Sequence, residues 1–230
     1  MLRKYITIVC FFLGIIAGMV QHQLTIPVIS YGENAVYHGI RGKNRIALTV
    51  NVDWGEEFLP GMLRILHEKG VKCTFFITGN WAEKYPDLVR EIIRLGHEIG
   101  NHGYRHLHPA NLSNEELIEL IKKNEELILN ISNGYQTTLF APPYGEVDKR
   151  IVKVAAELGY VTIMWSADTV DWQRPAPEII VQRAISKIDD GGIILMHPTE
   201  PSLYALSDII ETLQKRDYSF VTVSELIENK

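Results

Sequence analysis

A chain of 230 residues is long enough for one sizeable domain and too short for two of ordinary size. Hydrophobic residues make up 46% of the chain and charged residues 22%, which predicts a packed globular core. The formal net charge of −5 and the lack of a basic stripe argue against nucleic acid as a partner, because phosphates would find no cationic footprint.

The first residues of the chain have the pattern of an export signal. Arg3 and Lys4 precede an uncharged apolar run over residues 6–20. The run is short for a membrane span, which needs about 20 residues. A buried core helix is the alternative, but a terminal run with basic flanks favours export. We expect residues 1–22 to be a signal peptide or membrane anchor and residues 23–43 a linker. The protein would then be extracytoplasmic, secreted or held at the outer face of the cell membrane by this segment alone.

From residue 44 onward, strand-like runs alternate with helical patterns. The expected strands are residues 45–52, 73–77, 98–101, 138–141, 161–165, 193–196 and 219–223. The expected helices are residues 60–69, 86–95, 113–130, 147–158, 176–188 and 202–216. Ser113 and Glu116 fit a capping box, in which both side chains satisfy free N–H groups at a helix start. Strand alternating with helix predicts a parallel sheet covered by helices, and we place one α/β domain at residues 44–230.

Polar and aromatic side chains follow five of the seven expected strands. In chain order they are Asn51 and Asp53; His102 and His106; Pro142, Pro143 and Tyr144; Asp168, Asp171 and Trp172; and His197. In parallel α/β folds the site lies at the carboxyl ends of the strands. An open sheet would gather these residues at one switch point, whereas contributions from five strands indicate a ring. We therefore predict a deformed (β/α) barrel of about seven parallel strands.

His102, His106 and Asp53 are candidate metal ligands. The two histidines are four positions apart, so in a helical turn both would face one ion. Imidazole and carboxylate ligands suit zinc or a similar transition metal, and three protein ligands leave a position for water, as in catalytic sites. The alternative is a polar loop in a His-rich segment, which also holds His108. Asp53 and His197 at corresponding strand ends favour the metal interpretation.

His197 follows four apolar residues, so its imidazole should emerge from the core into the site. There it can act as a general acid beside an acidic neighbour, or simply bond to backbone. Tyr144 and Trp172 either pack at the rim or form aromatic walls on which sugar rings stack. Asp168 either lines the site or caps a turn.

These motifs, in this order and at these spacings, resemble the polysaccharide deacetylases of the NodB-homology group, carbohydrate esterase family 4. The shared motifs are Asn-His-x-x-x-His at 101–106, Pro-Pro-Tyr-Gly at 142–145, Asp-x-x-Asp-Trp at 168–172 and Leu-x-His at 195–197. The resemblance covers residues 44–230. The first motif, Asn-Val-Asp-Trp-Gly at 51–55, resembles a sporulation-type branch found in spore-forming bacteria.

The resemblance implies a deformed β/α barrel, a divalent metal and a glycan polymer as substrate. The reaction would remove N-acetyl groups from a cell-wall polysaccharide, a peptidoglycan or chitin-like polymer of GlcNAc or MurNAc, by attack of metal-bound water on the acetamide. Zinc is the metal expected, with cobalt or another transition metal as the alternative. The implied roles are metal ligation for Asp53, His102 and His106; oxyanion binding for the Tyr144 N–H; protonation of the amine for His197 with Asp171; and substrate contacts for Pro142, Pro143, Asp168, Trp172 and Leu195.

Two positions depart from the family pattern, in which an Asp acts as general base and an Arg pairs with it. Here Asn51 stands at the base position and Ala141 at the Arg position. Losing both is physically coherent, because an unpaired buried Arg would be costly. General-base catalysis contributes about 10²–10⁴-fold. A slow deacetylase and a catalytically weak glycan-binding relative are therefore both open.

Other assignments of the site are also open at this point. In another register Asp53 is the base, and the two histidines hold the metal with a different group. Glu56 and Glu57 are substitute bases that the spacing does not favour. A smaller acetylated or amide compound is a third choice of substrate, and the sequence does not indicate the oligomeric state.

Overall fold

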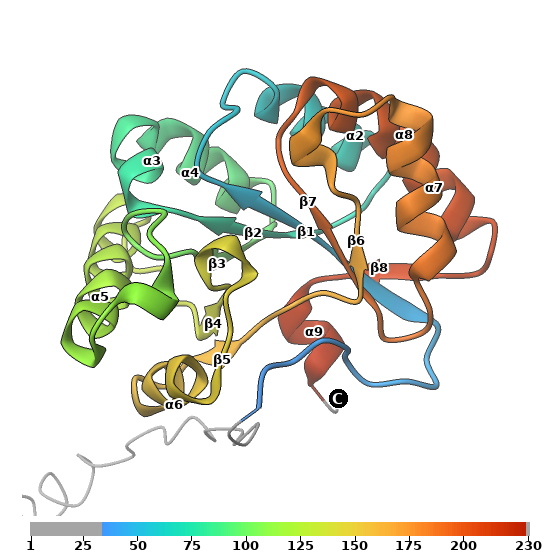
Figure 1. Cartoon of the computed structure of the whole chain (residues 1–230). Helices are drawn as coiled ribbons and strands as arrows, with labels where there is room; N and C mark the ends of the chain where they lie inside the picture. The colour runs from blue at the N-terminus through green and yellow to red at the C-terminus, as the bar shows by residue number, and fades with distance from the viewer. Residues whose placement is uncertain (1–33, 229–230) are drawn as a thin grey trace, which may run out of the picture. The chain divides into compact units, whose positions relative to one another are not determined.

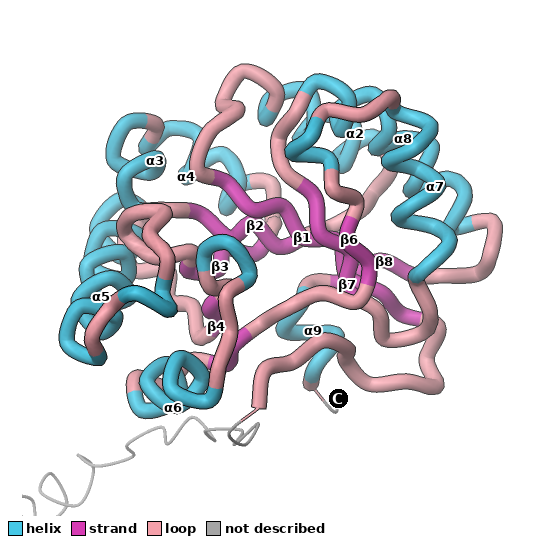
Figure 2. Tube along the Cα trace, in the orientation of Figure 1, coloured by secondary structure: helices cyan, strands magenta, loops and turns pink. Residues whose placement is uncertain are grey.

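The computed structural model describes residues 34–228, in which all the strands lie in one parallel sheet (Figures 1 and 2). Its order is β5-β4-β3-β2-β1-β7-β6, with β8 also paired to β1. The strands are β1 (Arg45–Val52), β2 (Thr74–Ile77), β3 (Glu98–Asn101), β4 (Leu139–Phe140), β5 (Val161–Thr162), β6 (Ala167–Asp168), β7 (Ile193–Met196) and β8 (Ser219–Val221). The sheet curls but does not close into a full barrel, because within the described residues the edge strands β5 and β6 do not pair. It is therefore a half-barrel. The predicted fold class, a deformed parallel β/α barrel, is confirmed.

The expected strand at 161–165 is shorter in the structure, because the chain crosses there from one sheet edge to the other. Val161 and Thr162 pair with β4. Four residues later the Ser166 N–H donates to the Ile193 carbonyl, and Ala167–Asp168 pairs with β7. The apolar run therefore spans the open side of the half-barrel, which a single-sequence pattern cannot distinguish from a continuous strand.

Eight α-helices are present in the described residues, and they lie around the curled sheet (Figure 1). They are α2 (Leu59–Glu68), α3 (Gly79–Lys84), α4 (Pro86–Arg94), α5 (Asn114–Ile131), α6 (Lys149–Glu157), α7 (Pro177–Lys187), α8 (Glu200–Gln214) and α9 (Val223–Ile227). The capping box at Ser113 and Glu116 is present. Helices α3 and α9 were not among the predicted helices, and Val223 was predicted to end the last strand. A second capping box, Thr222 with Glu225, begins α9 at that residue.

The alternation of side chains along β1 separates an outer core from an inner one. Ile46, Leu48, Val50 and Val52 belong to the cluster that packs under the surrounding helices. Ala47 belongs to a smaller cluster inside the curl. Because successive strand residues face opposite ways, the inner row continues through Thr49 and Asn51 toward Asp53.

Helix α9 fills one end of the half-barrel. Val223, Leu226 and Ile227 join the inner cluster, together with residues of β1, β2, β4 and β7. The carboxyl ends of the strands, at the other end of the curl, are left for the polar residues. The fold thereby directs the inner rows of several strands into one site.

Residues 34–43 form a strap between β5 and β7. The Val36 N–H donates to the Thr162 carbonyl over 2.8 Å, and the Gly39 N–H donates to the Gly191 carbonyl over 2.7 Å. Figure 1 shows this blue segment running past α9. The strap thus adds backbone hydrogen bonds on the side where β5 and β6 do not pair.

The predicted signal peptide or anchor, residues 1–22, lies outside the described residues. Of the predicted linker, residues 34–43 are described, and they form the strap. Among the described residues, no helix combines the length and apolarity needed to cross a membrane.

Candidate active site

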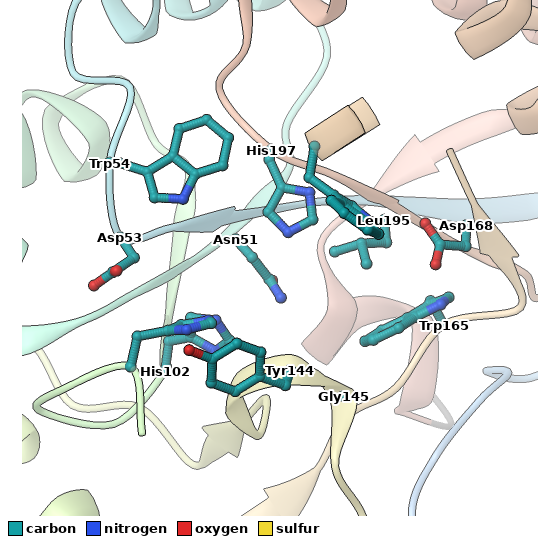
Figure 3. A pocket seen from close by; sticks show the side chains of 12 residues that line it. Asn51, Asp53, Trp54, His102, Tyr144, Gly145, Trp165, Asp168, Leu195 and His197 are labelled. Carbon is teal, nitrogen blue, oxygen red and sulfur yellow. The ribbon is translucent and has the colours of Figure 1, made fainter. Parts of the chain in front are cut away.

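A cavity of about 500 Å³ opens at the carboxyl ends of the strands (Figure 3). Its lining residues are Asn51, Asp53, Trp54, His102, His106, Tyr144, Gly145, Trp165, Asp168, Trp172, Leu195 and His197. Most of the residues predicted from the strand ends therefore meet at one place. Asp171 lies behind His197, and Pro142 and Pro143 do not line the cavity.

His102 and His106 lie side by side, with ring centroids 5.1 Å apart. The expected helical turn between them is absent, because the chain bends at Gly103, whose φ is +77°. His102 is 2% exposed and its Nδ1 lies 2.7 Å from the Ala141 carbonyl, to which it donates. This bond leaves Nε2 with a free lone pair, the atom that a metal would take.

Burial keeps both imidazoles neutral near pH 7. Burial, together with the neighbouring His106, lowers the pKa of His102 from 6.5 to about 3. Burial also lowers the pKa of His106, against the opposing effect of the Asp53 carboxylate. Neutral imidazole is the form that binds metal, so at neutral pH protons would not compete with a metal for these nitrogens.

Asp53 follows β1 and is held by Thr78, the residue directly after β2. The Thr78 hydroxyl donates to its Oδ1 over 2.8 Å, and Figure 3 shows the carboxylate turned away from His197. Among the described residues, no three His, Cys, Asp or Glu side chains are close enough together to hold a metal ion as they stand. The two imidazoles and the carboxylate fit zinc in donor type, while the third ligand is not in place.

His197 leaves β7 and pairs with a fully buried carboxylate. Its Nδ1 lies 2.8 Å from Asp171 Oδ1, and its backbone N–H donates to Asp171 Oδ2 over 2.6 Å. The Ser202 hydroxyl, at the start of α8, also donates to Oδ2 over 2.6 Å. Asp171 therefore fixes the ring of His197 and directs Nε2 toward the cavity. The structure places the predicted pair together.

Asn51 is the last inward-facing residue of β1 and is 6% exposed. Figure 3 shows its amide between His197 and Tyr144. Ala141, 2% exposed, follows β4, and no arginine lines the cavity. Glu56 does not reach the site, because it accepts a hydrogen bond from the Tyr85 hydroxyl over 2.5 Å, and Glu57 does not line it either. An amide thus occupies the position of the expected base.

Trp54 was not among the predicted site residues, but it forms part of the cavity wall. Its ring is nearly parallel to that of His197, with an interplanar angle of 8° and centroids 6.0 Å apart. The next residue, Gly55, has a φ of +86°, and a Cβ there would lie 2.1 Å from the Pro198 carbonyl oxygen. The backbone of the first motif therefore lies directly against the turn after His197. Trp54 directly follows Asp53 in the sequence, and this position was the signal that could have identified it as a site residue.

The other aromatic residues stand at the rim of the cavity. Tyr144 and Trp172 are 54% and 53% exposed, and Trp165 lies deeper. Trp165 was also missed, because it was placed at the end of a strand. Asp168 lines the cavity and also accepts a hydrogen bond from the Val170 N–H over 2.8 Å, so both of its predicted alternatives are met.

Residues 38–163 match a family model described as polysaccharide deacetylase. The chain belongs to the polysaccharide deacetylase family. A Bacillus cereus relative in this family, a peptidoglycan-N-acetylglucosamine deacetylase, is 36% identical over 84% of this chain and 71% of its own length. The uncharacterized protein YlxY of Bacillus subtilis is 41% identical over 84% of this chain, and the match spans 60% of its length.

A solved structure of this family bears on activity. BA3943 of Bacillus anthracis, described as a CE4 family pseudoenzyme, matches with a TM-score of 0.84 and 37% identity, over 86% of this chain and 70% of its own. A mutant of BA3943 with restored enzymatic activity has the same TM-score, at 35% identity. Family membership therefore leaves the activity of this chain open.

Proposed function

We propose that the protein is a slow, metal-dependent N-deacetylase of a cell-wall glycan containing GlcNAc or MurNAc. The observation that carries this proposal is the intact acid assembly. Asp171 is fully buried and receives bonds from the His197 ring, the His197 N–H and the Ser202 hydroxyl. A protein that only bound glycan would have no need for a buried carboxylate that orients one imidazole into the cavity.

In the proposed reaction, water adds to the acetamide carbonyl and gives up a proton to the solvent, and the C–N bond then breaks. Acetate leaves, and the amine nitrogen takes the proton that His197 Nε2 supplies. In this proposal the Tyr144 N–H donates a hydrogen bond to the oxyanion. The chemistry that a divalent metal at His102, His106 and Asp53 supplies is polarisation of the carbonyl and a lower pKa of water.

The proposed reaction is slow because the residue that should accept the proton from water is an amide. Asn51 occupies the expected base position, and no described residue replaces it there. Loss of a general base reduces the rate by about 10²–10⁴-fold. We thus expect turnover to be measurable but well below that of the active relatives.

The second candidate is a non-catalytic glycan-binding protein. The observation that favours it is the paired absence of a base and its partner, Asn51 with Ala141. The pseudoenzyme among the solved relatives supports this candidate. Three aromatic rings at or near the rim, Trp54, Tyr144 and Trp172, would serve glycan binding in either case.

Three narrower parts of the proposal rest on the sequence. We propose zinc as the metal, because imidazole with carboxylate suits it. We propose a place in the sporulation-type branch, on the Asp-Trp-Gly residues at 53–55. We also propose an extracytoplasmic location, since the glycan is a wall polymer and the basic, apolar N-terminus has the pattern of an export signal.

The test is acetate release by the full chain, loaded with zinc or cobalt, from N-acetylglucosamine oligomers and from peptidoglycan. We expect slow turnover, together with oligomer binding measured by calorimetry. Binding without turnover on every metal and substrate would replace the enzyme with the binding protein. If the chain shows neither oligomer binding nor turnover, both candidates are rejected.

Metal content provides the control for this test. His102→Ala should remove stoichiometric zinc, because it deletes a candidate ligand. His97→Ala should keep zinc, since His97 is buried and lies outside the cavity. Equal zinc content in both variants would show that the ligands are assigned wrongly.

A further inference from the structure

Tyr144 has a backbone conformation that few residues adopt. Its φ and ψ are 58° and 4°, the left-handed region that a side chain other than glycine occupies only at a cost. The turn that carries it, Pro143–Gly145, is a single 3₁₀ turn. The side chain is 54% exposed and still lines the cavity. Something outside this turn must therefore determine where the ring lies.

Two imidazoles hold the ring of Tyr144 from different sides. His108 stacks on its face, with centroids 3.8 Å apart and an interplanar angle of 6°. His106 meets it at 61°, with centroids 4.3 Å apart. The ring therefore lies between a candidate metal ligand and a histidine outside the cavity.

Glu146 fixes His108 in this stacked position. His108 Nδ1 donates to Glu146 Oε1 over 2.7 Å, and the Ala110 N–H donates to Glu146 Oε2 over 3.2 Å. Glu146 comes directly after the turn of Tyr144, whereas His108 and Ala110 lie in the loop that follows His106. The pair thereby ties the two loops together beside the cavity.

We propose that His108 and Glu146 are positioning residues for Tyr144, which together hold its ring as a wall of the glycan-binding cavity. This inference rests on the proposed function, because it assigns the wall to an N-acetylated oligosaccharide. His108 acts through stacking, and Glu146 acts by orienting His108. Neither residue lines the cavity itself.

The pair suits a mutational test because its contribution to folding is small. The side chains of His108 and Glu146 are 50% and 31% exposed, and exposed ion pairs contribute little to stability. Changes to them should therefore act on Tyr144 and leave the fold intact.

The test uses the full chain with His108→Ala, His108→Phe and Glu146→Ala, and His38→Ala as the control. His38 is another exposed histidine bonded to a carboxylate, Asp189, but it lies on the strap away from the cavity. One measurement is the Kd for an N-acetylglucosamine tetramer. The other is the NMR spectrum of ¹³C-labelled tyrosine rings, in which Tyr144→Phe identifies the Tyr144 signal.

We expect His108→Ala to shift the Tyr144 signal and to raise the Kd about 2- to 10-fold, the range of a lost aromatic pair. Glu146→Ala should do the same more weakly, while His108→Phe, which keeps a stacking ring, should stay near wild type. His38→Ala should change neither measurement. An unchanged Tyr144 signal in His108→Ala would overturn the inference. Absence of tetramer binding by the wild type would instead contradict the proposed function, with the Tyr144 signal still deciding whether the ring is held.

Discussion

At the scale of single residues, the proposed low rate depends on Asn51 and Ala141, the two positions predicted to depart from the family pattern. An amide accepts no proton from water, and a small apolar residue leaves no cation beside it. His102, His106 and His197 were predicted to meet at one site because strand ends converge in a parallel α/β fold. The pairing of His197 with Asp171 was predicted from the family resemblance. His108 was set aside as part of a His-rich segment, because spacing does not reveal that the loop bends at Gly103.

Restoring both residues should raise activity. We expect Asn51→Asp with Ala141→Arg to increase acetate release by about 10²-fold, the lower end of general-base catalysis. Asn51→Asp alone should give a smaller gain, because its carboxylate lacks a partner, and Ala141→Arg alone should destabilise the fold through an unpaired buried charge. Acetate release and urea unfolding measure these effects. If the double variant only weakens zinc binding, Asp53 is the base and our register is incorrect.

At the scale of elements, strand positions were easier to predict than their ends. The central strand β1 was identified to its limits, because its buried faces make most of its residues apolar or β-branched. The run at 161–165 was taken as one strand, since its crossing between sheet edges depends on partners distant in sequence. Helix α9 carried a readable signal, the Thr222 and Glu225 capping box, but the β-type residues around it favoured a strand.

The junction between β1 and the turn after β7 gives a stability prediction. Gly55→Ala should be strongly destabilising, because its Cβ would meet the Pro198 carbonyl oxygen at 2.1 Å and its φ is +86°. Gly159→Ala is the matched control, with a φ of +83° and nothing within 4 Å of the added Cβ. The control should lose about 1–2 kcal/mol from the left-handed conformation alone. Gly55→Ala should lose a further ~1–3 kcal/mol from overpacking, measured by urea unfolding. Equal losses would mean that the Pro198 contact relaxes freely.

At the scale of the whole molecule, the expected ring is a half-barrel with a plugged end and an open side. Five strand ends correctly indicated a curled sheet with one site. The strap of residues 34–43 could not be foreseen, because its polar sequence reads as a linker and only its partners make it part of the fold. Its bonds to Thr162 and Gly191 hold chain segments on both sides of the gap.

The molecule should lose stability in mild acid because it buries neutral histidine. His97 is 4% exposed, and burial lowers its pKa from 6.5 to about 4. The unfolded chain therefore binds a proton on this residue below pH 6.5 that the folded chain refuses until about pH 4. The free energy of unfolding should fall across this window by up to ~3 kcal/mol for this residue, at about 1.4 kcal/mol per pH unit.

Urea unfolding of the metal-free protein between pH 7 and pH 4 measures this loss. His97→Asn should flatten the curve, because asparagine does not titrate and still offers an oxygen to the Cys73 N–H, which donates to His97 Nδ1 over 3.3 Å. Parallel curves for wild type and His97→Asn would place the acid sensitivity elsewhere.

The pairing of β1 also bears on the order in which the protein can assemble during synthesis. Ala47 pairs with Ile193 and Arg45 with Ser219, so the strand that carries Asn51 is among the first made and among the last completed. Contacts so distant along the chain form slowly. A ribosome must reach residue 221 before β1 has all its neighbours. A nascent chain stopped short of β7 contains the candidate ligands His102 and His106 but neither His197 nor a finished cavity.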